Sequence, residues 1–269
     1  MATTKSGTTA EIEIIGLDKG RATYHIVGTS PLLCNRLSEK AKRELLLPGG
    51  PRRGAARAES LKHVPLQEYR DSPYTLRDGE GPTRLALLSS MFKKSLTAAA
   101  LRTPGATKTE LGQLVQPIGN RLPLYGRPEL YMAIVRSADM NHTPDVRTRA
   151  ILPEWACEIT FEWVAPQLRE KSITNLLARA GFFIGVGDYR PEKGAGSYGQ
   201  FRIADVDDPD LRRIRDQGVA VQDAALAEPT FHDADTEDLF AWFTSEVGRR
   251  GLEGPPSRNG IATPEGVLA

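Results

Sequence analysis

The chain has 269 residues, of which 40% are hydrophobic and 26% charged, and its formal net charge is +1. This length suits one large domain or two small ones with a buried core. No run approaches the roughly 18 apolar residues of a membrane span, the polar segment 1–10 lacks the apolar core of a signal peptide, and two cysteines and four scattered histidines predict neither a disulfide framework nor a metal site. We therefore expect a cytoplasmic protein that does not act on membranes and uses no cofactor.

The small net charge conceals an uneven distribution along the chain. Residues 204–269 contain six basic and fourteen acidic side chains, so residues 1–203 hold the remaining 29 basic and 20 acidic ones. A basic body followed by an acidic segment is typical of a protein whose body binds a polyanion. We predict a flexible leader over 1–10, a binding domain over 11–204 and an acidic, partly disordered tail over 205–269.

The first predicted elements are a β-hairpin and a short helix. Segments 11–15 and 21–27 alternate polar and apolar residues on either side of a turn at 17–20, which predicts the hairpin. Ser38 is a suitable N-cap for a helix over 39–47.

A basic stretch with a loop-like composition follows. Residues 36–62 carry eight Lys or Arg and three Glu side chains, and the overlapping segment 48–65, rich in Pro, Gly, Arg and Ala, predicts a basic loop insertion. A guanidinium group can bind two oxygens of one phosphate, so the cluster of arginines predicts a phosphate-binding surface. The alternative is a solvated loop without a binding role. The cations that we assign to this surface are Arg36, Lys40, Arg43, Arg52, Arg53, Arg57 and Lys62.

The rest of the body is predicted to contain two helices and several strands. Apolar residues recur every three or four positions over 83–102, which predicts a long helix with one buried face. Cys157, Ile159, Phe161 and Trp163 alternate with polar residues and predict a strand with one buried face. In order, we predict a helix over 83–102, strands over 114–118, 130–135 and 156–164, a helix over 172–180 with Gly181 as its C-cap, and strands over 182–186 and 200–204.

This order of elements predicts the fold class. A strand, a helix, two strands, a helix and a strand, all of antiparallel type, indicate an α+β protein with an RRM-like or ferredoxin-like antiparallel sheet and packed helices. The core segments are 21–28, 83–102, 128–135, 156–164, 172–180 and 200–204.

The segment Gly194–Gly199 matches the letters of G-x-G-x-x-G but leads into a strand rather than a helix, so it does not indicate a dinucleotide fold. A tight loop between strands is one interpretation. The other is a nucleic-acid site, in which exposed backbone N–H groups and cations hold phosphates while tyrosine rings stack on bases. Its residues are Tyr189, Arg190, Lys193, Gly194, Gly196, Tyr198 and Gly199, and four further cations, Lys93, Lys94, Arg147 and Arg149, extend the predicted surface.

The acidic segment contains an aromatic motif at 237–243. Leu239, Phe240, Trp242 and Phe243 follow several carboxylates there. A helix with this pattern either docks on the body or binds a groove of a partner protein or of a neighbouring copy.

Several of these segments together resemble a known family. Thr29-Ser-Pro-Leu-Leu ends the first strand, a basic insertion follows, the stretch from Leu76 contains a polar turn and a helix with a central Lys-Lys pair, and Gly194-Ala-Gly-Ser-Tyr-Gly-Gln-Phe lies near the end. Over roughly 21–204 this layout is similar to the RAMP superfamily, the Cas7-like backbone proteins of CRISPR effectors, and to phage-borne proteins of DNA metabolism. The resemblance implies an RRM-like core, a glycine-rich loop and a thumb-like insertion.

We therefore expect a protein without enzymatic activity that binds single-stranded DNA or RNA, forms homo-oligomers along it, acts in phage-type replication or recombination, and contacts a protein partner through its acidic segment. One alternative is a Cas7-like subunit that binds guide RNA. Another is an enzyme that acts on a nucleotide and uses Gly194–Gly199 to hold its phosphates.

Overall fold

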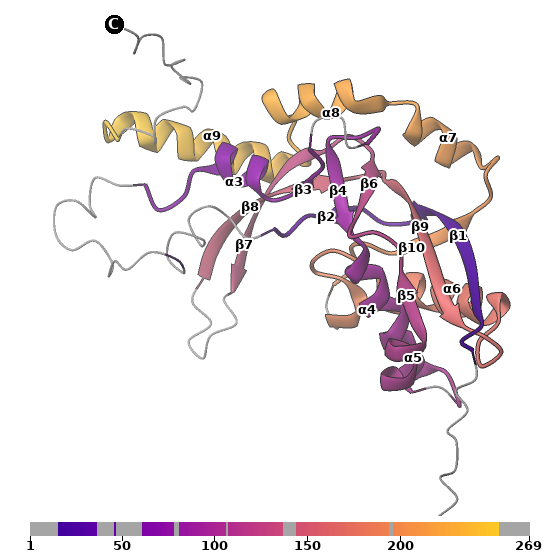
Figure 1. Ribbon diagram of the computed structural model, residues 1–269. Coiled ribbons are helices and arrows are strands. Elements are labelled where there is room, and N and C mark those ends of the chain that lie inside the picture. Colours follow the sequence, from indigo (N-terminus) through magenta and orange to yellow (C-terminus); the bar gives the residue numbers. More distant parts are fainter. Residues whose placement is uncertain are drawn as a thin grey trace, which may run out of the picture.

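The structure is a computed structural model that describes residues 16–36, 46, 61–77, 81–105, 107–136, 144–193 and 196–252. The described part is an α+β fold with two sheets of antiparallel strands and helices packed on them (Figure 1). The larger sheet has the order β10 (Phe201–Ala204), β1 (Lys19–Gly28), β9 (Ala156–Val164), β6 (Arg121–Tyr125), β4 (Leu85–Leu88) and β3 (Tyr74–Thr75), and β5 (Val115–Pro117) also pairs with β9. The smaller sheet has the order β2 (Leu32–Leu33), β8 (Pro144–Leu152) and β7 (Glu129–Arg136).

The inner face of the larger sheet carries the main core. Helices α4 (Ser89–Ala99) and α6 (Glu170–Phe183) cover it. Along the chain, α4 is followed by η1 (Ala100–Arg102) and then by α5 (Lys108–Leu114). Inward side chains of β1 and β9, such as Ile26 and Phe161, are fully buried against residues of these helices. Removing such side chains from water contributes about 1.5–3 kcal/mol each, which fixes both helices on this face.

The outer face of the larger sheet is polar where no helix covers it. Lys19 and Arg21 of β1 lie 3.7 and 3.9 Å from carboxylate oxygens of Glu162 on β9. The hydroxyls of Thr23 and Thr160 are 2.7 Å apart. Helix α7 (Pro209–Arg215) covers one end of this face with the apolar side chains of Leu211 and Ile214.

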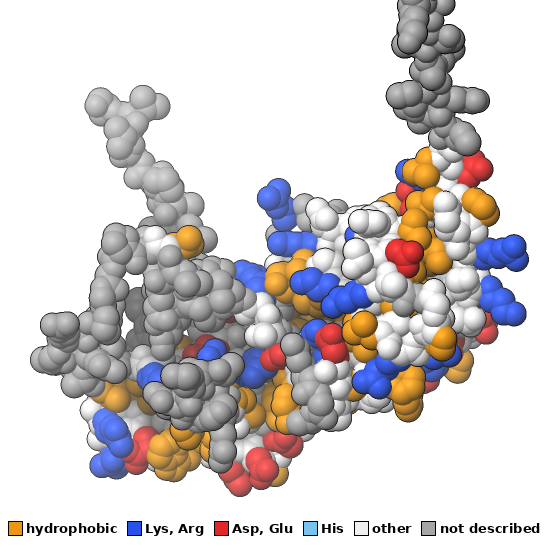
Figure 2. Space-filling view, turned by 90° about the horizontal axis from the view of Figure 1, so that it is seen from below, with side chains coloured by type: hydrophobic (Ala, Val, Ile, Leu, Met, Phe, Trp, Pro, Cys, Tyr) orange, Lys and Arg blue, Asp and Glu red, His pale blue; other side chains and the backbone are white. Residues whose placement is uncertain are grey.

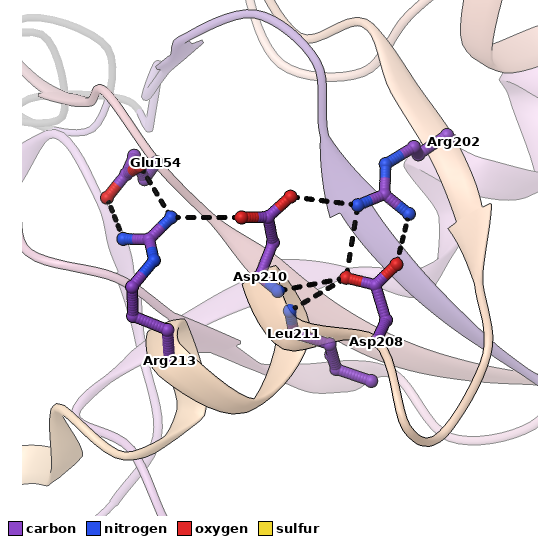
Figure 3. Close-up of polar contacts among 6 residues, drawn as sticks. All are labelled: Glu154, Arg202, Asp208, Asp210, Leu211 and Arg213. Atoms are coloured by element: carbon purple, nitrogen blue, oxygen red, sulfur yellow. Dashed lines mark hydrogen bonds and ion pairs between the residues drawn. The ribbon is translucent and has the colours of Figure 1, made fainter.

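A network of arginines and carboxylates holds α7 against the sheet (Figure 3). Asp208 caps α7 by accepting hydrogen bonds from the backbone N–H groups of Asp210 and Leu211, and it also pairs with Arg202 of β10 at 2.6 Å. Arg213 of α7 forms a two-pronged pair with Glu154 at 2.5 and 2.7 Å. Hydrogen bonding from Arg202 lowers the pKa of Asp208 to about 2.

The acidic segment predicted as a tail is folded over its described part. After α7 this segment forms α8 (Gly218–Ala227) and α9 (Ala234–Arg249). A helix from the earlier part of the chain, α3 (Pro65–Asp71), packs on the smaller sheet. Gln222 of α8 is buried and donates to the carbonyl oxygens of Leu124 and Gly126 at 2.8 and 3.0 Å. Residues 205–252 are therefore part of the packed body, and 253–269 lie outside the described residues.

The predicted helix over 83–102 is wrong in its first third. Residues Leu85–Leu88 form strand β4 between β3 and β6, and the helix α4 begins only at Ser89. Leu85, Ala86 and Leu87 are all buried, and a short continuous apolar run of this kind fits a strand as well as a helix.

Three other predictions also differ from the structure. Gly181 is not a C-cap, because α6 continues through it to Phe183; a Cβ at this position would overlap the carbonyl oxygen of Phe201, so the glycine allows α6 to approach β10. The strand predicted over 182–186 is absent, since Phe182 and Phe183 form the last turn of α6. Of the strand predicted over 114–118, only Val115–Pro117 is a strand, and Leu114 ends α5.

The segment 128–135 is a strand, as predicted, but it was wrongly placed in the core sheet. It forms β7 of the smaller sheet, and the unpredicted β6 occupies the position beside β9. The predictions over 156–164 and 200–204 are confirmed by β9, with its alternating burial, and by β10. The predicted strand over 11–15 and, apart from residue 46, the predicted helix over 39–47 lie outside the described residues, as does most of the insertion over 48–65.

Candidate nucleic-acid interface

The glycine-rich loop between α6 and β10 packs against the hairpin of β7 and β8. In this loop, η2 (Pro191–Lys193) follows a turn at Tyr189. Arg149 of β8 forms an ion pair with Asp188 of the loop, and the ring centroids of Tyr131 on β7 and Tyr198 are 6.3 Å apart. We call the surface formed by Tyr131, Arg149, Asp188, Tyr189, Arg190 and Tyr198 the junction site.

Glycines shape this loop because it folds back on itself. Gly199 has a φ of +72°, and a Cβ there would overlap the carbonyl oxygen of Val186. A Cβ at Gly196 would likewise overlap the carbonyl oxygen of Tyr189. Tyr189 itself has a φ of +49°, an uncommon backbone conformation for a residue with a side chain. The loop therefore holds Tyr189 in a defined and strained position.

Some of the backbone donors predicted to bind phosphate are already used. The N–H of Tyr198 donates to the carbonyl oxygen of Tyr189 at 3.3 Å, and that of Gly199 donates to Pro31 at 2.7 Å. The prediction of exposed N–H groups is therefore wrong at these two positions. The described part of the segment is a loop, but it follows α6 and η2 rather than a strand, so the interpretation as a loop between strands is only partly correct. At Tyr198 and Gly199, a phosphate contact would fall to the side chains or to other backbone groups.

The tyrosines of the junction site form a row that runs from solvent into the body. Tyr189 is 50% exposed, its ring centroid lies 6.0 Å from that of Tyr198, and Tyr131 lies next in the row. His232 packs edge-on against Tyr131 at 5.7 Å and contacts Glu129 through Nδ1 at 2.9 Å. Burial, together with hydrogen bonding to Tyr198, raises the pKa of Tyr131 to about 12, so this phenol is neutral at pH 7. The exposed ring of Tyr189 therefore packs against Tyr198, which in turn packs against Tyr131.

The cations of the junction site are paired with carboxylates of the same loop. Arg190 contacts Glu192 through Nε at 2.9 Å and also donates to the carbonyl oxygen of Gly187 at 3.0 Å. The side chain of Arg149 is only 14% exposed, and Asp188 is its partner. Both guanidinium groups are therefore held in place, and a phosphate would have to displace a carboxylate to reach them.

A second set of predicted cations continues along the hairpin. On β8, Arg147 lies two residues from Arg149, so the two side chains share one face of the sheet. Arg147 and Lys62 both contact Asp145, at 3.5 and 2.7 Å, and His63 lies between Asp145 and Glu68 at 3.0 and 2.8 Å. Arg149 and Arg147 of β8, together with Lys62 from the segment before α3, thus form a basic strip that begins at the junction site and contains the carboxylate of Asp145.

The other predicted cations of the described residues contact groups outside this surface or are exposed. Lys93 of α4 donates to Gln116 of β5 at 2.6 Å, and Lys94 is exposed on the same helix. Arg36 follows β2 and donates weakly to the carbonyl oxygen of Pro73 at 3.5 Å. The side chain of Lys193 lies outside the described residues, as do Lys40, Arg43, Arg52, Arg53, Arg57 and Gly194.

Sequence reasoning missed Tyr131 and Asp188 as members of this site, and it missed His232 as the residue that packs on Tyr131. The signal for Tyr131 is its position opposite Arg149 in the β7–β8 register, which becomes visible only once the two strands are paired. His232 reaches the site because residues 230–232 pair with the free edge of β7 through the backbone of Leu130. No local motif indicates that pairing.

The aromatic motif predicted to bind a partner lies in α9. Leu239 and Phe240 pack against the main core, and Phe240 lies 5.2 Å from the ring of Phe231. Phe243 is partly buried, whereas Trp242 is 62% exposed. Docking on the body thus accounts for two of the four residues, and binding of a partner stays a prediction for Trp242.

The described residues offer neither a candidate metal site nor a candidate membrane-spanning helix. Its residues contain no group of three or more His, Cys, Asp or Glu side chains placed to hold a metal ion. None of the described helices combines the length and the apolar character needed to cross a membrane. No protein-family model matches the sequence, and no curated protein is significantly similar to it.

Proposed function

We propose that this protein binds single-stranded DNA or RNA at the junction site and has no enzymatic role there. The observation that carries the proposal is the exposed ring of Tyr189, backed by Tyr198 and flanked by Arg190. A base can stack on such a ring without any requirement for its identity, because every base has a π-face. The guanidinium groups then contact the adjacent phosphates.

The basic strip gives the strand a path beyond the first base. From Arg149 the nucleic-acid strand passes Arg147 of β8 and then Lys62, which precedes α3 and contacts Asp145 of β8. The carboxylates Asp188, Glu192 and Asp145 accompany these cations, so binding exchanges ion pairs within the protein for ion pairs with phosphate. We therefore expect moderate affinity at physiological salt and a marked loss of affinity as salt rises.

The ferredoxin-like core belongs to the same proposal. The order β10-β1-β9-β6 with antiparallel neighbours, and with α4 and α6 on one face, supports such a core within the larger sheet. In an RRM the outer face of the sheet carries stacking aromatics. On the corresponding face β1 and β9 present ion-paired side chains such as Arg21 and Glu162, so we assign the nucleic acid to the junction site instead.

A salt titration tests the class of function. Binding of labelled single-stranded DNA and RNA homopolymers is measured by fluorescence anisotropy at increasing salt concentration, with the duplex of the same length as a control. We expect saturable binding that weakens along a straight line of log affinity against log salt. Absence of binding to both polymers at low salt would exclude the proposal.

A Cas7-like subunit that binds guide RNA is the second candidate. The hairpin of β7 and β8 is inserted between β6 and β9, and the glycine-rich loop contacts it; this supports the thumb-like insertion that the resemblance implies. Discrete RNA of uniform length that co-purifies with the protein from the expression host would favour this candidate. Protein that is free of RNA and binds added DNA equally well would favour the first.

A further inference from the structure

A second exposed surface with aromatic and basic side chains lies at the ends of η1 and α6. Leu101 is 74% exposed and Phe182 66% exposed. Phe183 packs edge-on against Phe182, with centroids 4.9 Å apart, and the guanidinium of Arg102 lies 5.3 Å from the Phe183 centroid. Arg179 donates to the carbonyl oxygen of Arg102 at 3.2 Å. We call Leu101, Arg102, Arg179, Phe182 and Phe183 the end patch.

The end patch exposes apolar side chains to solvent, and its arginines lack described carboxylate partners. Among the described residues, neither Arg102 nor Arg179 has a carboxylate within ion-pair distance, whereas Arg149 and Arg190 of the junction site both do. Figure 2 shows hydrophobic and basic side chains interspersed on the lower face of the molecule. Adjacent exposed phenylalanines of this kind mark an interaction surface.

Helix α9 presents a surface of complementary chemistry. Asp235, Asp238 and Trp242 are spaced by three and four residues, so they share one face of the helix, and all three are exposed. No described cation lies within ion-pair distance of either aspartate. An indole binds well to a guanidinium and to the edge of a phenyl ring, and the two carboxylates match the two free arginines.

The two surfaces cannot meet within one molecule. Helix α9 packs on β7 at one end of the fold, whereas α4, η1 and α6 lie at the other end (Figure 1). A contact between different surfaces of two copies is heterologous, and it builds an open chain unless the rotation closes a ring.

We propose that the end patch of one molecule binds the α9 face of a second copy of this chain, with Trp242 against Phe182 and Phe183 and with Asp235 and Asp238 beside Arg102 and Arg179. The chemistry favours a protein partner over nucleic acid, because the exposed Leu101 offers nothing to a phosphate, whereas it adds apolar area for an indole. This inference does not depend on nucleic-acid binding.

Two variants, each with one surface disabled, test the proposal in the absence of nucleic acid. The first is Trp242→Ala with Asp238→Lys, which leaves the end patch intact. The second is Phe182→Ser with Arg179→Glu, which leaves α9 intact. Val206→Ser, which removes an exposed apolar residue outside both surfaces, is the matched control. Molar mass is measured by light scattering over a range of protein concentrations.

We expect the mass of the natural protein and of the control to rise with concentration beyond twice the monomer mass, while each double variant stays monomeric. Mixing the two variants should give a dimer and nothing larger, because only one pair of intact surfaces remains. A monomeric natural protein, assembly by either variant alone, or a mixture that stays monomeric would overturn the proposal. So would a second variant that assembles normally but loses affinity for single-stranded DNA, since the end patch would then bind nucleic acid.

Discussion

The junction site and the end patch contain the same kinds of side chain but differ in how the fold holds them. In the junction site Arg149 and Arg190 are paired with Asp188 and Glu192, and the loop beneath them is closed by backbone hydrogen bonds. In the end patch Arg102 and Arg179 contact only an aromatic ring and a carbonyl oxygen among the described residues. The ion pairs of the junction site hold its arginines in fixed positions but neutralise their charge. The arginines of the end patch keep their charge available for a partner, because no described carboxylate pairs with them.

The largest difference should appear when a glycine is replaced in each region. Gly199→Ala in the junction site should lower the free energy of unfolding by about 2–4 kcal/mol, because a Cβ would overlap the carbonyl oxygen of Val186 and the φ is positive. Gly105→Ala, close to the end patch, has a similar φ of +78° but open space around it, so we expect a loss of about 1 kcal/mol. Urea denaturation of both variants measures the difference, and equal losses would show that the loop is not closely packed.

Removal of one arginine from each region gives the next largest effect. Arg149→Ala leaves Asp188 without its partner in a half-buried place and should destabilise the fold by about 1–3 kcal/mol. Arg179→Ala should change stability by no more than about 0.5 kcal/mol, since the side chain has only a carbonyl partner. Thermal denaturation of the two variants side by side checks this; a larger loss for Arg179→Ala would reverse the comparison.

The ion pairs that hold α7 predict a dependence on pH. The pKa of Asp208 falls from its ordinary 3.8 to about 2 on folding, so its contribution to stability is fully present above pH 3.8 and is lost as the pH falls through 2. Asp208→Asn keeps a helix-capping side chain but removes the charge. The variant should be less stable than the natural protein at pH 6, and the gap should shrink as the pH approaches 2. Denaturation at a series of pH values measures the gap, and a constant gap would contradict the assignment.

The smallest expected effect is the gain in nucleic-acid affinity when the carboxylate partner of Arg190 is removed. Glu192→Gln frees Arg190 from its exposed partner, so affinity for single-stranded DNA should rise about two- to fivefold at low salt. Asp216→Asn changes the net charge equally at the C-cap of α7, away from the junction site, and should have a smaller effect. If both variants gain affinity equally, net charge rather than the position of Arg190 explains the change.

Sequence reasoning predicted local patterns well and long-range pairing poorly. The alternation in Ala156–Val164 predicted β9 with its buried face, because strand burial follows a period of two residues. It did not separate Leu85–Leu88 from α4, since a fully buried strand and a helix share a continuous apolar run. The composition of the loop singled out Tyr189 and Arg190 as candidates, whereas Tyr131 became a candidate only from the register of β7 against β8, which is set by tertiary packing.

The charge division along the chain predicted the acidic segment but not its role in the fold. Asp208 and Asp210 pair with Arg202 of β10, and Glu154 pairs with Arg213, so the acidic and basic parts of the chain are joined through folded contacts. Removal of residues after Ala204 would therefore expose the outer sheet face under α7, and point substitutions are the sharper way to study the binding surface.

The most direct test of the proposed interface is the affinity of Tyr189 variants for single-stranded nucleic acid. Tyr189→Asn removes the ring and suits the left-handed backbone, whereas Tyr189→Phe keeps a stacking ring at the same place. We predict that Tyr189→Asn weakens binding by the equivalent of about 1–3 kcal/mol, and that Tyr189→Phe binds like the natural protein at the same salt concentration. Unchanged affinity in Tyr189→Asn, with the fold intact by circular dichroism, would contradict the assignment of the junction site.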